Sequence, residues 1–234
     1  MNWLRRAQPW LGTLVEVGVP EGACADAAFA ALRRVQACMS RFDPHSDVGR
    51  FAALPVGGCM EVAQDTAQVL HAARALQQAS GGLFDITQGR APQGWHCEGR
   101  LLTKRDAAAA LDLGGIAKGY AVDCAVQALQ AQGCTAGWVN AGGDLRAFGS
   151  VQVPILLRDE EAGELRPFAQ LEDGAFATSR FGAATRSRIP GVQAHASVAA
   201  PQCLWADALT KVVAASGDTR HPLLAGYDAR AWLH

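Results

Sequence analysis

The residues best suited to chemistry lie in one stretch, 111–123, which reads LDLGGIAKGYAVD. Gly114 and Gly115 carry no Cβ and can adopt positive φ angles, so a ligand could approach the backbone there. The helix predicted after them directs its N–H groups and the positive end of its dipole to the same point, and Lys118 adds a full positive charge. The stretch predicts an anion site, most simply for phosphate. A glycine turn packed against a strand, with Lys118 in solvent, explains this pattern equally well.

Four further stretches place Gly, Asp, Ser or Thr beside apolar strand or helix ends: 40–51, 84–87, 140–144 and 206–210. Each has an ordinary structural explanation. Asp85 is typical of an Asx turn, residues 140–144 of a tight hairpin corner, and Asp207 of a helix N-terminus. The chain contains no P-loop motif, no G-x-G-x-x-G, no G-x-S-x-G elbow and no H-E-x-x-H, so those nucleotide, hydrolase and zinc-protease classes are unsupported.

Composition bounds the remaining classes. The chain has 234 residues, half of them hydrophobic, which predicts one domain over residues 1–234, either a single large unit or two interleaved lobes. A net charge of −1 with scattered Lys and Arg argues against a nucleic-acid partner. No apolar run approaches the ~20 residues that span a bilayer, and neither a signal peptide nor a lipobox is visible, so we expect a cytoplasmic protein. Seven cysteines without a C-x-x-C pair predict buried free thiols.

The elements that must position these residues alternate irregularly. Periodicity predicts helices over 23–39, 62–78, 116–132 and 205–215, with Ser46 capping a short helix and Gly133 ending the third long one. We expect strands over 11–19, 138–140, 145–148, 151–157, 164–171, 175–178, 194–200 and 229–233, a strand or turn over 83–87, and a loop over 88–98. The strands over 151–157 and 164–171 should pair around a turn at 159–163. This order favours an α+β fold with mixed or antiparallel sheets flanked by helices.

Taken in order, seven stretches resemble the motifs of the FAD:protein FMN transferases, the ApbE family, over most of the chain. The longest match is 113–123 (LGGIAKGYAVD), close to the family's L-G-G-[IV]-A-K-G-Y-[AV]-x-D. The others are 11–13 (LGT), 40–43 with 46–51 (SRFD, SDVGRF), 82–87 (GLFDIT), 139–144 (VNAGGD), 177–179 (ATS) and 206–209 (ADAL).

This resemblance implies an ApbE-like flavin-binding fold that holds FAD in an extended cleft, with a magnesium ion at the pyrophosphate. It also implies a reaction in which FMN moves from FAD onto a threonine hydroxyl of an acceptor protein and AMP leaves. Carried over by position, Asp207 and Lys118 are catalytic, and the Ala117 carbonyl and Asp207 carboxylate are metal ligands. The cofactor-binding positions are Thr13, Phe42, Asp85, Thr87, Gly114, Gly115, Ala117, Lys118, Asp123, Asn140, Gly142, Gly143, Asp144, Ser179 and Lys211.

The sequence departs from the family at three places. Lys211 stands where A-D-A-L-[AS]-T has a threonine ligand, and Thr210, one residue early, should point elsewhere because one helical residue turns about 100°. The Lys211 ammonium could instead occupy the metal's place and meet the pyrophosphate. The family's H-I-I-D-P-R-T-G segment is replaced over 186–191, and we expect His195 to be a strand-edge histidine without that role. Arg180 replaces a glycine, where it would crowd the cleft or face a phosphate.

Two functions therefore remain open. One is a flavin transferase with a rearranged metal site. The other is a degenerate FAD-binding relative that no longer transfers and acts as a flavin carrier, sensor or partner-binding protein. Lys211 and the missing histidine segment favour the second, whereas the order of the motifs favours the first, which we adopt as the prediction.

Overall fold

The centre of the molecule is a seven-stranded antiparallel sheet in the order β1-β2-β6-β7-β10-β11-β12. The computed structural model describes residues 2–158, 164–182 and 192–234. The strands of the sheet are β1 (Trp3–Trp10), β2 (Thr13–Pro20), β6 (Gly137–Ala141), β7 (Asp144–Phe148), β10 (Gly174–Phe181), β11 (Ala194–Ala200) and β12 (Arg230–Leu233).

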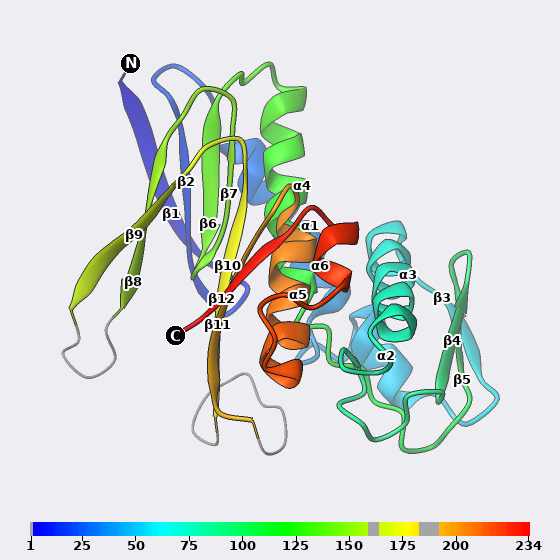
Figure 1. The fold of residues 1–234 in the computed structure, drawn as a ribbon. Coiled ribbons are helices and arrows are strands. Elements are labelled where there is room, and N and C mark those ends of the chain that lie inside the picture. The colour runs from blue at the N-terminus through cyan, green and yellow to red at the C-terminus, as the bar shows by residue number, and fades with distance from the viewer. Residues whose placement is uncertain (1, 159–163, 183–191) are drawn as a thin grey trace.

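Successive side chains along each strand point to opposite faces of this sheet, and other elements cover both faces. One face is covered by α1 (Asp26–Met39), α4 (Ala117–Ala131) and α5 (Cys203–Ser216), with α4 packed between the other two (Figure 1). The opposite face carries a smaller aromatic cluster that includes Trp138 and Phe176. The antiparallel hairpin of β8 (Val153–Arg158) and β9 (Leu165–Leu171) packs its Ile155 and Leu171 into that cluster.

A smaller group of elements lies to one side of the helices in Figure 1. It consists of α2 (Asp47–Ala53), α3 (Gln64–Ala79) and a sheet in the order β3-β5-β4, formed by Cys59–Glu61, Leu101–Lys104 and Trp95–Glu98. The short α6 (Leu223–Gly226) precedes β12. One continuous hydrophobic core joins both groups, because Leu76 and Trp95 belong to the same buried cluster as Val122 and Leu209.

The predicted α+β class is confirmed, and so are the four long helices and the pairing of β8 with β9. Two predictions that depend on residues close in sequence, the Ser46 cap and the helix end at Gly133, are also confirmed. The Ser46 hydroxyl caps α2 by accepting a hydrogen bond from Gly49 N at 2.9 Å, and Gly133 follows α4 with φ 81°. The turn predicted over 159–163 lies outside the described residues.

Other expectations differ from the structure. The first strand does not begin at Leu11, because Leu11 and Gly12 form the turn between β1 and β2 with φ angles of 56° and 73°. β1 went unpredicted because its arginines and proline hide the alternation, which an edge strand tolerates. Residues 88–98, expected as a loop, contain β4, and β5 was not predicted. Both strands are short, and β5 pairs with β4 on one side and with β3 on the other. The residues directly before Gly114, 107–113, form no strand. Residues 83–87, predicted as a strand or a turn, form bends and turns.

All seven cysteines are free thiols, as predicted, but the expected burial applies to only two of them. Cys124 and Cys203 are buried, whereas Cys24 and Cys59 are exposed. Burial raises the pKa of Cys124 to about 11, so this thiol stays protonated at neutral pH. Within the described ranges, no helix is both long and apolar enough to cross a bilayer.

Candidate functional site

The Gly114–Gly115 loop is shaped by close contacts and not by unusual backbone angles. Both residues could adopt positive φ angles, but neither lies in the left-handed region. A Cβ on Gly115 would lie 3.0 Å from Lys211 Cε, and one on Gly114 would lie 3.0 Å from Asp112 Oδ1. The absence of a side chain at Gly115 therefore lets the Lys211 stem lie against the loop.

Several N–H groups at the start of α4 already donate hydrogen bonds to acceptors within the protein. Gly114 N donates to Asp112 Oδ1 at 2.9 Å, and Ala117 N donates to Leu113 O at 2.8 Å. Gly119 N donates to Asp207 Oδ2 at 3.1 Å. The helix end is therefore less open than its sequence predicts, and an anion there would use the remaining N–H groups together with side-chain charges.

Those charges form two buried ion pairs, here called the charge cluster: Lys118 with Asp144 and Lys211 with Asp207. Both carboxylates are fully buried, and the lysine side chains are 26% and 14% exposed. Lys118 comes from the first turn of α4, Asp144 from the start of β7, and the other pair from consecutive turns of α5. The structure thus brings together four predicted site residues.

Electrostatics within the charge cluster separate its two carboxyl groups. Burial, followed by the charge of Asp207, raises the pKa of Asp144 from 3.8 to about 6. Burial also disfavours the charged form of Asp207, but Lys211 and Lys118 outweigh it and lower the pKa of that carboxyl. Burial by itself would lower the pKa of Lys118. The charges of Asp144 and Asp207 together have the larger effect and raise this pKa, so Lys118 stays charged.

Asp144 has unused hydrogen-bonding capacity. Its Oδ2 contacts Lys118, whereas its buried Oδ1 has no hydrogen-bond partner among the described residues. A buried acceptor without a partner is costly, so such atoms commonly mark a place that a ligand or water completes. Asp144 Oδ1 is therefore an acceptor that could receive a donor group from a bound ligand.

Ser179 joins β10 to the charge cluster. Its hydroxyl lies 3.3 Å from Lys211 Nζ and 3.2 Å from Thr210 Oγ1. Thr210 does not point away as expected, because its buried hydroxyl also donates to Asp207 O at 2.7 Å. Thr210 and Lys211, which are adjacent on α5, therefore both contact Ser179.

Three of the motif loops meet at Asp112, which the sequence reasoning did not single out. Arg41 Nη1 and Gln88 Nε2 donate to Asp112 Oδ2 at 2.8 and 2.9 Å, and Asp112 N donates to Ile86 O at 2.8 Å. Phe42, beside Arg41, is 84% exposed. Asp112 lies two residues before Gly114, a spacing typical of an Asx turn, and that signal could have identified it.

Asp85 and Thr87 hold their own loop. The Asp85 carboxylate accepts from Thr87 N at 2.9 Å, from the Thr87 hydroxyl at 2.7 Å and from Gly89 N at 2.7 Å. This is the Asx turn that the residue types favoured. Both residues therefore shape the segment that leads to Gln88.

The glycines of residues 140–144 form a tight hairpin corner between β6 and β7. Gly142 and Gly143 have φ angles of 63° and 103°, and Asn140 Oδ1 accepts from Gly143 N at 3.0 Å. A Cβ on Gly142 would lie 2.4 Å from Thr13 Oγ1. Thr13, Asn140 and the two glycines therefore share one corner, directly before Asp144.

Asp123 is a structural anchor for α5. Its carboxylate accepts from Cys203 N at 3.0 Å and Leu204 N at 2.8 Å, and it pairs with Arg146 at 2.6 Å. It takes the place of a local cap, because Gln202 makes no side-chain hydrogen bond to the helix. The sequence reasoning missed Arg146, although its position two residues after Asp144 on a strand predicts the same sheet face.

The remaining departures fall on β10 and β11. β11 lies between β10 and β12, so the expectation of a strand-edge His195 is wrong; its Nε2 lies 3.2 Å from Thr178 Oγ1. Arg180 is exposed, and strand alternation places it on the face opposite Ser179. Residues 186–191 lie outside the described residues.

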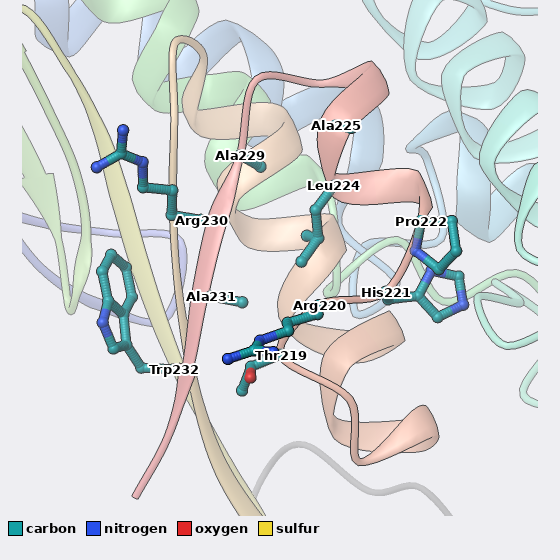
Figure 2. Close-up of a pocket in the computed structure, with 10 residues that line it drawn as sticks. All are labelled: Thr219, Arg220, His221, Pro222, Leu224, Ala225, Ala229, Arg230, Ala231 and Trp232. Carbon is teal, nitrogen blue, oxygen red and sulfur yellow. The ribbon is translucent and has the colours of Figure 1, made fainter.

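One pocket on the described surface lies away from this site. It has a volume of about 560 Å³ and lies between α6 and β12. Figure 2 shows Leu224 and Ala231 near this space, with Trp232 on the other side of β12. None of its lining residues belongs to the predicted site.

Metal ligands are sparse in the part of the chain that the structure describes. It contains no group of three or more His, Cys, Asp or Glu side chains that could hold a metal ion. Both oxygens of Asp207 already have partners, Lys211 on Oδ1 and Gly119 N on Oδ2. The predicted pair of Ala117 and Asp207 therefore does not offer an open ligand set.

Comparisons with known proteins identify the family to which the chain is similar. A model of the ApbE family matches residues 11–101 and 93–229. Comparison with curated protein sequences gives no match.

Among solved structures, the flavin transferase ApbE from Vibrio cholerae matches with a TM-score of 0.85 and 20% identity, covering 99% of this chain and 93% of the other. The flavinyl transferase ApbE from Pseudomonas stutzeri gives 0.83 and 22%, with coverage of 99% and 90%. The ApbE protein from Thermotoga maritima gives 0.84 and 22%, with coverage of 99% and 94%. At these identities the structures show a shared fold, and the family match extends over most of the sequence, so the chain belongs to the ApbE family.

Proposed function

We propose that this protein is a flavin transferase that moves FMN from FAD onto a threonine hydroxyl of an acceptor protein and releases AMP. Family membership and the fold shared with flavin transferases support this proposal. The observation that carries it is the convergence of the family motifs. The Gly114–Gly115 loop, Lys118, Asp144 and the Asp207–Lys211 pair come from separate segments and meet in one charge cluster.

The proposed reaction exchanges a phosphoanhydride bond of FAD for a phosphate ester bond to threonine. The threonine oxygen bonds to the phosphorus on the riboflavin side of the pyrophosphate, the bond from that phosphorus to the bridging oxygen breaks, and AMP leaves with that oxygen. The hydroxyl proton passes to solvent. Such a transfer depends on positioning and on neutralising phosphate charge. In this chain Lys118 would supply the positive charge, and backbone N–H groups near Gly115 would supply hydrogen-bond donors to the phosphate.

The other motif residues would hold the rest of FAD. The corner formed by Thr13, Asn140, Gly142 and Gly143 allows close backbone approach. The exposed ring of Phe42 offers a face for stacking against an aromatic ring system. We propose that the chain acts as one domain, because a single hydrophobic core joins its two groups of elements.

The direct test is incubation of the purified protein with FAD and a threonine-bearing acceptor protein. We expect covalently bound flavin, seen as in-gel fluorescence of the acceptor, together with an equal amount of released AMP. An acceptor with that threonine changed to alanine is the control. FAD that binds without AMP release would contradict the transferase and leave a flavin-binding protein.

FAD should bind more tightly than FMN. The second phosphate and the adenosine add contacts at the charge cluster, and we expect a difference of about tenfold, equal to about 1.4 kcal/mol. Quenching of flavin fluorescence during titration measures both affinities. Equal affinities would show that the Gly114–Gly115 loop does not bind the pyrophosphate.

FAD affinity should depend on pH through Asp144. Its pKa of about 6 means that it becomes neutral as the pH falls from 8 to 5, while Asp207 stays charged opposite Lys118 and Lys211. Loss of one buried negative charge should strengthen the binding of a phosphate anion by roughly fivefold. Asp144→Asn should bind at pH 8 as the unmodified chain does at pH 5. Affinity that falls on acidification would contradict this role.

A further inference from the structure

We propose that the ammonium group of Lys211 takes the place of a divalent cation at the pyrophosphate site, so that this protein binds FAD without a metal ion. The inference rests on the proposed function, since it concerns how the same site holds its substrate. It concerns a residue at which this chain departs from the family motif.

The Lys211 ammonium has a complete set of partners within the protein. It contacts Asp207 Oδ1, lies 2.9 Å from Asp207 O and 3.3 Å from Ser179 Oγ. An ammonium group has three donors and no acceptor capacity, so these oxygens match its needs. Two of the three acceptors belong to Asp207, the residue that the family resemblance assigns to the metal.

A magnesium ion does not fit the same oxygens. Mg²⁺ requires near-octahedral oxygen ligands at close range, whereas Asp207 Oδ1 already contacts an ammonium and Asp207 Oδ2 accepts from Gly119 N at 3.1 Å. The Lys211 side chain is only 14% exposed. A metal ion would have to displace a buried, fully bonded ammonium group, and breaking a buried ion pair is strongly unfavourable.

The lysine is also placed where a phosphate would need positive charge. Its Cε lies 3.0 Å from the position of a Cβ on Gly115, so its stem runs against the Gly114–Gly115 loop. Lys118 lies on the turn of α4 that follows this loop and is drawn into the same cluster by Asp144. Two fixed ammonium groups therefore flank the predicted pyrophosphate position.

The first experiment measures FAD binding by fluorescence quenching, in EDTA and in excess Mg²⁺. The unmodified protein should bind with the same affinity in both, within about twofold. Lys211→Thr should bind weakly in EDTA and gain roughly tenfold or more with Mg²⁺, because it restores the family's ligand type. Lys211→Met, which keeps the length of the stem without charge or oxygen, should bind weakly in both. A tenfold gain with Mg²⁺ in the unmodified protein would overturn the proposal.

The second experiment uses Mn²⁺ alone, followed by electron paramagnetic resonance without any flavin. We expect one bound Mn²⁺ in Lys211→Thr and none in the unmodified protein. Mn²⁺ binding to both proteins, or to neither, would overturn the proposal. If the unmodified protein binds no FAD at all, the proposed function fails, and the Mn²⁺ comparison still decides the role of Lys211.

Discussion

Replacing Lys118 by methionine should lower the free energy of unfolding by about 3 kcal/mol, because it leaves the fully buried Asp144 without its charge partner. Methionine keeps most of the side-chain volume, so the loss reports the charge and not a cavity. Urea denaturation followed by circular dichroism measures it. A loss below about 1 kcal/mol would be typical of an exposed pair and would contradict the buried ion pair.

A matched double variant separates the ion pair from other effects of the substitution. Lys118→Met combined with Asp144→Asn removes both charges, so much of the lost stability should return, as is usual when both partners of a buried pair are replaced. FAD affinity should not return with it, because the phosphate still lacks the Lys118 charge. Recovery of both stability and binding would show that Lys118 serves only to balance Asp144.

Replacing Asp123 by alanine should have the largest effect on stability, a loss of about 4 kcal/mol in the free energy of unfolding. The substitution leaves the partly buried Arg146 without its partner and removes the acceptor for the first N–H groups of α5. A broken buried pair costs about 3–5 kcal/mol, and loss of a helix cap about 1 kcal/mol. The variant is measured in urea beside the unmodified chain.

Because α5 carries Asp207 and Lys211, the same substitution should weaken FAD binding, although the partners of Asp123 are Arg146 and the backbone at the start of α5. Asp123→Asn keeps one oxygen acceptor for α5 and loses the charge and the second acceptor oxygen, so its stability should lie between those of the alanine variant and the unmodified protein. Equal stabilities for the alanine and asparagine variants would show that the hydrogen bonds to Cys203 N and Leu204 N contribute little.

Features with a local physical cause were predictable from the sequence. The four long helices follow from apolar spacing, and the cap at Ser46 and the Asx turn at Asp85 follow from side chains that bond to backbone a few residues away. The Lys211–Asp207 pair was also predictable from the sequence, because residues four apart on a helix are neighbours. The order of the motifs was sufficient to indicate the family.

Strands without a strong local pattern were not predictable. β1 contains Arg5, Arg6 and Pro9, and its pairing with β2 gives it strand geometry. β4 and β5 exist because they pair with each other. Strand pairing depends on partners elsewhere in the chain, so periodicity alone cannot reveal it.

The stretch 111–123 shows the division most clearly. By itself the sequence determined that a glycine pair precedes a helix and that Lys118 lies in its first turn. Only the tertiary structure decided that Lys118 pairs with Asp144, 26 residues away, that Gly115 receives the stem of Lys211, and that Asp123 caps a helix 80 residues on. The physical reason is that a charge or a glycine acquires its role from what packs against it. Those neighbours come from β7 and α5, whose approach is set by the shared hydrophobic core.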